Sequence, residues 1–228
     1  MDFVGIDKFS LLDFDGYISV VLFAPKCNFR CPFCHNGQSV LSNNSSIPFN
    51  EIIDYLNSRK GVIDAIVVTG GEPTLMDDLF DKISTLKKMG YLIKLDTNGT
   101  NPEMLQKLIH ANLLDYIAMD IKNGESMYMT TSGVKCLDIN LIKESISLIM
   151  NSGIDYEFRT TLVKEYHSLE SIKEMSKLVN GANRLYLQHF IDREGVILPG
   201  LHDVSFEEAS LYKEELSKYV KSCQLRGY

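Results

Sequence analysis

The chain has 228 residues, of which 45% are apolar, and its 23 Lys and Arg against 30 Asp and Glu give a formal net charge of −7. The apolar fraction excludes an intrinsically disordered chain, and the length suits one domain covering residues 1–228. The acidic balance argues against binding to nucleic acid. The apolar segment 17–25 is far shorter than the roughly 20 residues of a membrane span. We therefore expect a cytoplasmic protein with no membrane helix and no export signal.

Short apolar runs alternate with amphipathic stretches along the chain. Strands are predicted at 17–23, 63–69, 91–96, 116–121, 156–162 and 184–190. Apolar residues at three- and four-residue spacing predict helices at 51–58, 77–89, 102–114, 140–153, 169–181 and 205–221. The polar stretch 42–48 is expected to be a surface loop.

This alternation is typical of βα units built around a parallel sheet. Most of the predicted strands are almost continuously apolar, as strands covered on both faces require. Six such units are too few for the closed eight-fold barrel. The expected fold is therefore α/β, an open partial (β/α)6 barrel with no linker dividing it.

The sequence holds five cysteines, and three of them follow the first predicted strand closely. Cys27, Cys31 and Cys34 form a C-x3-C-x2-C pattern, whereas Cys136 and Cys223 stand alone and receive no role. An odd number of cysteines, three of them clustered, does not suggest a disulfide framework. In a reducing compartment such a cluster indicates a metal or redox site.

Three kinds of site could use this pattern, and a fourth reading is simply buried structural cysteines. Zinc needs four ligands, and although His35 is adjacent, no second ligand pair is present. The CPFC tetrad resembles the redox pair of glutaredoxins, but that function would leave Cys27 without a role. A [4Fe-4S] cluster held by three local cysteines would leave one iron open to another ligand. We favour the cluster.

Gly70, Gly71 and Glu72 follow the second predicted strand, at a strand-to-helix turn. Turn chemistry alone would account for the glycines and for Pro73 as the first helical residue. Glu72 would stand at the N-cap position, where Ser, Thr, Asp or Asn is preferred. We therefore expect Glu72 to have another role.

Two carboxylates end the next two predicted strands. Asp96 and Asp120 are expected to project from the same edge of the sheet, where they would repel each other unless a cation or a base lay between them. Lys122 shares the face of Asp120 and could supply part of that charge. A turn or helix cap is the alternative explanation for the segment 96–99.

The last two predicted strands add further polar side chains. Arg159 and Thr161 share one face, and an Arg inside a small barrel needs an anion. His189 lies near the end of the sixth strand, although a lone His is more often structural than a ligand. Because parallel βα proteins build their active sites at the carboxyl ends of strands, these positions indicate one site.

The C-x3-C-x2-C loop, with aromatic Phe33 just before its last cysteine, resembles the signature of the radical S-adenosylmethionine (SAM) enzymes. The segment Gly70-Gly71-Glu72-Pro73 is similar to the Gly-Gly-Glu-Pro motif of that family. The resemblance implies a [4Fe-4S] cluster on the three cysteines, with SAM chelating the open iron. It also implies that the glycine-rich segment binds the amino group of SAM.

The segments around Asp96 and Asp120 resemble those of the glycyl-radical-enzyme activases. That resemblance implies that Asp96, Thr97 and Asp120 hold a metal cation near the SAM carboxylate, and the carboxylate would be the anion for Arg159. The residues expected to contact SAM are Phe33, Gly70, Gly71, Glu72, Thr97, Lys122, Arg159, Thr161 and His189.

The CNFRCPFCHN core is similar to that of anaerobic ribonucleoside-triphosphate reductase activating proteins. This resemblance implies a protein that installs a glycyl radical on a partner reductase, with a flavodoxin- or ferredoxin-like electron donor. It also matches Asp13 to an acidic residue that positions the target peptide. The sequence departs from the common pattern at Ala24-Pro25-Lys26 and at Asp15, where Gly and Pro respectively are usual.

Three alternatives remain open at this point. One is an activase of another glycyl radical enzyme, of the pyruvate formate-lyase type. Another is a small-molecule radical SAM enzyme such as a 7-carboxy-7-deazaguanine synthase. The third is a non-catalytic iron-sulfur or thiol-redox module, which would have no need of the charged residues at the strand ends.

Overall fold

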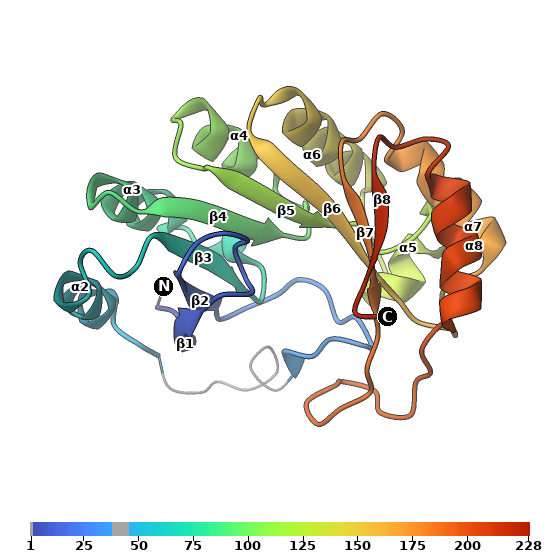
Figure 1. The fold of residues 1–228 in the computed structure, drawn as a ribbon, viewed down its shortest axis with the longest axis horizontal. Coiled ribbons are helices and arrows are strands. Elements are labelled where there is room, and N and C mark those ends of the chain that lie inside the picture. The colour runs from blue at the N-terminus through green and yellow to red at the C-terminus, as the bar shows by residue number, and fades with distance from the viewer. Residues whose placement is uncertain (1, 38–45) are drawn as a thin grey trace.

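The computed structural model describes residues 2–37 and 46–228, and it shows one curved sheet with helices along its convex side (Figure 1). Within these residues, eight strands follow one another across the sheet in chain order. They are β1 (Gly5–Ser10), β2 (Ser19–Ala24), β3 (Ala65–Gly70), β4 (Leu92–Thr97), β5 (Tyr116–Asp120), β6 (Asp155–Leu162), β7 (Leu185–His189) and β8 (Cys223–Arg226).

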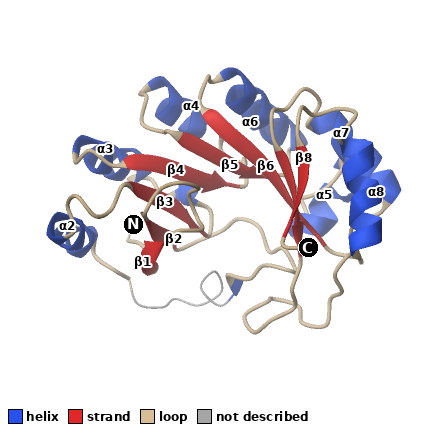
Figure 2. Cartoon of the chain, in the orientation of Figure 1, coloured by secondary structure: helices blue, strands red, loops and turns tan. Residues whose placement is uncertain are grey.

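The helices form an outer row around the fan of strands (Figure 2). They are α2 (Phe49–Ser58), α3 (Leu79–Lys88), α4 (Pro102–His110), α5 (Glu125–Ser132), α6 (Ile139–Asn151), α7 (Leu169–Leu178) and α8 (Phe206–Leu216), with a short 3-10 helix, η1 (Pro73–Leu75). Within the described part of the chain, no helix has the length and apolar character needed to cross a membrane.

The strand pairing confirms the prediction of an open α/β barrel. The strands β2 to β8 are all parallel to their neighbours, and only β1 runs antiparallel, with Gly5 opposite Phe23. Because the sheet runs from β1 at one edge to β8 at the other, it stays open on its concave side. The six strands expected from the sequence are β2 to β7.

Three elements were not expected. The strands β1 and β8 lie at the edges of the sheet, and with one partner strand each they are too short or too exposed to show continuous apolar runs. Helix α5 has no clear apolar face in its sequence, ESMYMTTS, so helical periodicity could not reveal it. The surface loop expected at 42–48 lies mostly outside the described residues.

The main core lies between the sheet and the helices, where Ile66, Val68 and Leu95 are fully buried. A second, smaller cluster lies on the concave face, where Phe14 packs over Val21, Ala65 and Val67. This cluster fills the barrel near the amino ends of β2 and β3. The carboxyl ends of the strands, where the sequence predicts the functional site, are not filled by this cluster.

Candidate active site

A cavity of about 210 Å³ lies at the carboxyl edge of the sheet. Its walls come from the loop after β2 and from the ends of β3, β4, β5 and β6. The sequence-predicted residues that line it are Cys27, Cys31, Phe33, Cys34, Gly70, Gly71, Glu72, Asp96, Thr97, Asp120, Lys122, Arg159 and Thr161. His35, weighed above only as a zinc ligand, also lines the cavity, and the lining residues not expected from the sequence are Phe29, Asn36, Thr69 and Asn98.

The cysteine loop is folded by hydrogen bonds of its own backbone. Cys34 N–H donates to the carbonyl of Cys31 at 3.0 Å, and Phe29 N–H donates to Cys27 Sγ at 3.3 Å. The Arg30 guanidinium bends back and donates to the carbonyls of Cys27 and Phe29, at 2.5 and 2.7 Å. The loop is thus held in a tight turn with its three thiols facing one cavity.

Burial raises the pKa of the Cys27 thiol to about 11 and that of Cys31 to about 12, although the nearby Lys122 ammonium opposes both shifts. Both thiols are therefore neutral at pH 7 unless a metal centre compensates the thiolate charge. Within residues 2–37 and 46–228, no group of three His, Cys, Asp or Glu side chains could hold a single metal ion. Three thiols lining one cavity are a donor set suited to a [4Fe-4S] cluster that keeps one iron open.

The glycines after β3 bring that strand against the start of the cysteine loop. Gly70 has a φ of 104°, and a side chain at Gly71 would overlap the carbonyl of Lys26. Gly71 N–H donates to Ala24 at 3.0 Å, and Glu72 N–H donates to Lys26 at 2.5 Å. The glycine pair therefore has a structural task, which is to hold the cysteine loop in place.

Glu72 corrects our expectation about helix capping. Its side chain is 1% exposed and caps η1, accepting from Thr74 N–H at 3.1 Å and Thr74 Oγ1 at 2.5 Å. The same carboxylate accepts from Thr97 Oγ1 at 2.7 Å and from Asn98 N–H at 2.6 Å. A Glu is long enough to do both, so it fastens the end of β3 to the end of β4 while still lining the cavity.

A network of four charges spans the floor of the cavity. The Arg159 guanidinium lies between two carboxylates, donating from Nε to Asp120 Oδ1 at 2.9 Å and from Nη1 to Asp96 Oδ2 at 3.1 Å. Lys122 Nζ donates to Asp120 Oδ2 at 3.0 Å. Burial alone would raise the pKa of Asp120, but Arg159 and Lys122 outweigh it and lower that pKa to about 2. Asp120 therefore stays ionised.

This network changes the picture drawn from the sequence. The position between Asp96 and Asp120, where a metal cation was expected, is bridged by Arg159, and the Thr97 hydroxyl is turned toward Glu72. Asp96 Oδ1 is nevertheless a buried acceptor that makes no hydrogen bond to the described residues, with Lys94 Nζ at 3.9 Å. One carboxylate oxygen is therefore left for a bound group.

Two predicted site residues lie away from the cavity. His189 Nε2 lies 2.9 Å from Asp203 Oδ2, and its ring packs against Tyr228. Asp13 lies in the loop between β1 and β2, where its carboxylate accepts from Ser10 Oγ at 2.5 Å. Of the lone cysteines, Cys136 is exposed and Cys223 is buried in β8.

Helix α5 is a support for the cysteine loop that the sequence did not reveal. At its end, Ser132 accepts from Arg30 N–H at 2.9 Å. Gly133 follows with a φ of 68°, so close to the Arg30 carbonyl that a side chain there would overlap it. On the other side of the loop, Leu198 N–H donates to Pro32 at 2.8 Å. The loop is therefore fastened from two distant parts of the chain.

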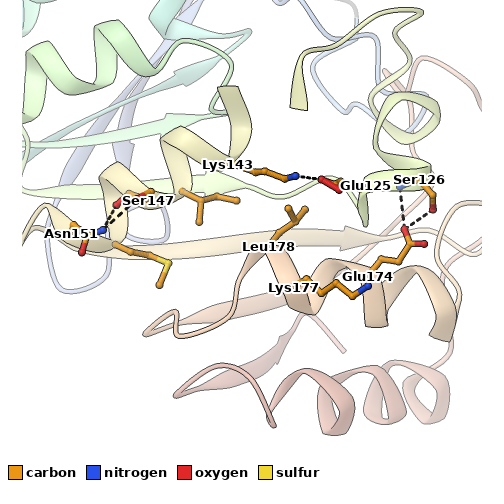
Figure 3. A pocket seen from close by; sticks show the side chains of 10 residues that line it. Glu125, Ser126, Lys143, Ser147, Asn151, Glu174, Lys177 and Leu178 are labelled. Carbon is orange, nitrogen blue, oxygen red and sulfur yellow. Dashed lines mark hydrogen bonds and ion pairs between the residues drawn. The ribbon is translucent and has the colours of Figure 1, made fainter. Parts of the chain in front are cut away.

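A larger hollow, of about 750 Å³, lies among α5, α6 and α7 in the outer helical layer (Figure 3). Glu125 and Lys143 form an ion pair across it, and Glu174 accepts from Ser126 N–H and Oγ. None of the predicted site residues lines this hollow. Its size alone does not make it the active site.

An open parallel barrel with three loop thiols facing buried carboxylates and cations defines an iron-sulfur enzyme that binds a small charged cofactor. The chain belongs to the radical SAM superfamily, whose family model matches residues 21–179. Enzymes of this family use a [4Fe-4S] cluster and SAM, and the chain is an oxidoreductase of this class.

Comparisons with known proteins agree with this assignment. A Methanocaldococcus jannaschii protein with the name "putative glycyl-radical enzyme activating enzyme" is 34% identical, over 95% of this chain and 90% of its own. A Saccharolobus solfataricus "probable GTP 3',8-cyclase" is 26% identical, over 88% of this chain and 63% of its own. A domain of a Bacteroides vulgatus pyruvate-formate lyase-activating enzyme shares the fold, with a TM-score of 0.58 at 17% identity, over 72% of this chain and 99% of its own.

Proposed function

We propose that this protein is a single-domain activating enzyme that installs a glycyl radical on a partner enzyme, and that the partner is an anaerobic ribonucleoside-triphosphate reductase. The main support is the match to a relative named as such an activating enzyme along nearly the whole of both chains. The CNFRCPFCHN core supports the choice of reductase.

The chain's own residues would divide the work as follows. Cys27, Cys31 and Cys34 hold the cluster. Glu72 and the glycines before it would hold the amino group of SAM, and Lys122 and Arg159 would hold its carboxylate. When bound and reduced by the electron donor, the cluster and SAM would supply the one-electron chemistry that takes a hydrogen atom from the target glycine. The ion pairs of the cavity floor keep this charge arrangement fixed before SAM arrives.

Asp96 is the best-placed residue for the proposed cation, because its Oδ1 is buried beside the cavity without a hydrogen bond to the described residues. In that position a cation would lie next to a carboxylate already shared with Arg159. Thr97 and Asp120 are the other two residues of this proposed cation site.

The open concave side gives a partner segment access to the cavity. A hollow of about 720 Å³ lies on this side, toward the amino ends of the strands. Lys94 and Glu157 line the hollow, whereas Asp96 and Arg159, two residues further along the same strands, line the cavity. Side chains two apart share a face at a spacing of roughly 7 Å, so the hollow and the cavity follow one another on the concave face, and we call the two together the trough. A glycine-bearing loop could lie along it.

The experiment is activation of the purified reductase by reconstituted protein, SAM and a flavodoxin- or ferredoxin-like donor. A glycyl radical should appear by paramagnetic resonance, and deuterium placed on the target glycine should be recovered in 5'-deoxyadenosine. A radical on pyruvate formate-lyase instead would change the target but keep the class. Release of 5'-deoxyadenosine without a protein radical on any glycyl radical enzyme of the host would refute the proposal.

A second candidate is an enzyme acting on a small molecule, favoured by the similarity to a GTP 3',8-cyclase over 88% of this chain. It predicts that a nucleotide-like substrate, and no protein, accelerates SAM cleavage. A non-catalytic module is the weakest candidate, because it gives no reason for the ion-pair network beside the cysteines.

A further inference from the structure

The end of β1 and the loop that joins it to β2 expose a group of large apolar side chains. Leu12 is 89% exposed, Leu11 59%, Phe9 54% and Tyr17 40%. We call these four residues the lip patch. Scattered exposed leucines are common, but neighbouring large apolar side chains at one place are typical of a protein-binding surface.

The turn that carries the lip patch is ordered. Ser10 Oγ accepts from Leu12 N–H and from Asp13 N–H, both at 3.2 Å, and donates to the Asp13 carboxylate. Lys94 Nζ donates to the Asp13 carbonyl at 2.5 Å. The turn therefore holds its leucines outward before any partner binds, which lowers the entropy lost on binding.

Aromatic contacts fasten the same turn to the barrel. Phe14 is buried, with its ring centroid 4.8 Å from that of Tyr17 and 5.5 Å from that of Tyr116 on β5. Leu12, Phe14 and Tyr17 also line the 720 Å³ hollow. Two members of the lip patch, Leu12 and Tyr17, thus border the hollow of the trough.

The charges beside the lip patch are mainly negative. Asp7, Asp13 and Asp15 are all exposed in this short stretch. Lys8 turns away, with its ammonium 5.3 Å from the ring centre of Tyr55. A complementary surface would therefore present apolar side chains flanked by Lys or Arg.

We propose that the lip patch docks the folded surface of the target glycyl radical enzyme, at an apolar area flanked by basic residues near its glycine-bearing loop. This inference rests on the proposed function. The patch binds the body of the partner, while the trough receives the loop. Docking would hold the two proteins together long enough for the loop to enter.

The test compares the Phe9→Ser/Leu11→Ser double variant, which changes two lip-patch residues that do not line the hollow, with a matched control. Leu211→Ser removes a leucine of similar exposure, 58%, from α8 on the outer layer. The double variant should bind the target protein at least 10-fold more weakly in titration calorimetry, while the control binds as wild type. Iron content and SAM affinity should be unchanged in both, because none of the three replaced residues lines the cavity.

A short synthetic peptide carrying the target glycine separates docking from chemistry. Hydrogen transfer from the peptide should be equal in wild type and double variant, whereas radical formation on the whole target should fall and recover at high target concentration. Unchanged affinity for the target, or an equal loss with peptide and protein, would overturn the docking role. If wild type itself activates no glycyl radical enzyme, the proposed function fails, and the docking role with it.

Discussion

Nε2 of His167 donates a hydrogen bond of 3.0 Å to the backbone carbonyl of Lys122, 45 residues earlier in the chain. The ring is buried, burial lowers its pKa, and Nδ1 accepts from Val163 N–H at 3.1 Å. A neutral imidazole with its proton on Nε2 satisfies both contacts. His167 therefore fixes the backbone from which Lys122 reaches Asp120.

His167→Asn should weaken SAM binding more than His167→Gln does. Gln can place an amide donor near the position of Nε2 and keep the contact with Lys122, whereas Asn reaches only the position of Nδ1. Loss of one buried hydrogen bond is worth about 1 kcal/mol, or roughly 5-fold in affinity. Titration calorimetry would measure the difference in SAM affinity, provided that the two variants have the same melting temperature. Equal SAM affinities for the two variants would rule out a positioning role.

Replacing Cys27, Cys31 or Cys34 by Ala should abolish the brown colour and the roughly four irons per chain expected after anaerobic reconstitution. Cys136→Ala and Cys223→Ala should keep both, because neither side chain lines the cavity. Iron analysis and absorption spectra make the measurement. Stoichiometric zinc without iron in the reconstituted protein would contradict the cluster.

Gly133→Ala should lower the iron content although it touches no cluster ligand, because its methyl group would push the Arg30 carbonyl out of place. Gly153→Ala is the matched control, since Gly153 has a φ of 76° but nothing within 4 Å of an added methyl group. Both variants carry the strain of a positive φ, about 1 kcal/mol. Only Gly133→Ala should alter the cluster's paramagnetic resonance spectrum. If the two variants gave the same spectrum, α5 would not be a support of the cysteine loop.

Glu72→Ala should both destabilise the protein and weaken SAM binding. The change leaves the buried donors of Thr74, Thr97 and Asn98 unpaired, at a cost of about 2–5 kcal/mol. Loss of a charge-assisted contact to SAM would add a roughly 10- to 150-fold fall in affinity. Thr97→Val removes one of the four hydrogen bonds to Glu72 but keeps the carboxylate. It therefore separates the loss of stability from the loss of the contact to SAM. A destabilised Glu72→Ala protein with unchanged SAM affinity would make the residue purely structural.

Asp120 should stabilise the fold in a pH-dependent way. Its pKa is lowered to about 2 from an ordinary value of 3.8, so its contribution is full above the ordinary value and is lost as the pH falls through the folded one. The difference in unfolding free energy between wild type and Asp120→Asn should therefore be constant near neutral pH and shrink between about pH 4 and pH 2. Denaturant titration of iron-free protein measures it. If the difference in unfolding free energy grew as the pH fell, the lowered pKa of Asp120 in the folded protein would be contradicted.

The sequence predicted the six inner strands and most cavity residues because these carry strong local signals. Continuous apolar runs mark β2 to β7, and the polar residues at their ends must meet at one edge. It could not show that Arg159 bridges Asp96 and Asp120, because such pairing depends on how far each side chain reaches across the sheet. His167 and Gly133 carried no local signal, since their partners lie far away in the chain.

The fastening of the cysteine loop has a consequence for how the protein is made. The loop is held by Ser132 at the end of α5 and by Leu198 near the end of the chain, although its own residues are synthesised first. On the ribosome, the three cysteines therefore emerge long before the walls that order them. Iron insertion into a fully shaped site must wait until residue 198 has left the exit tunnel, so cluster loading follows synthesis instead of accompanying it.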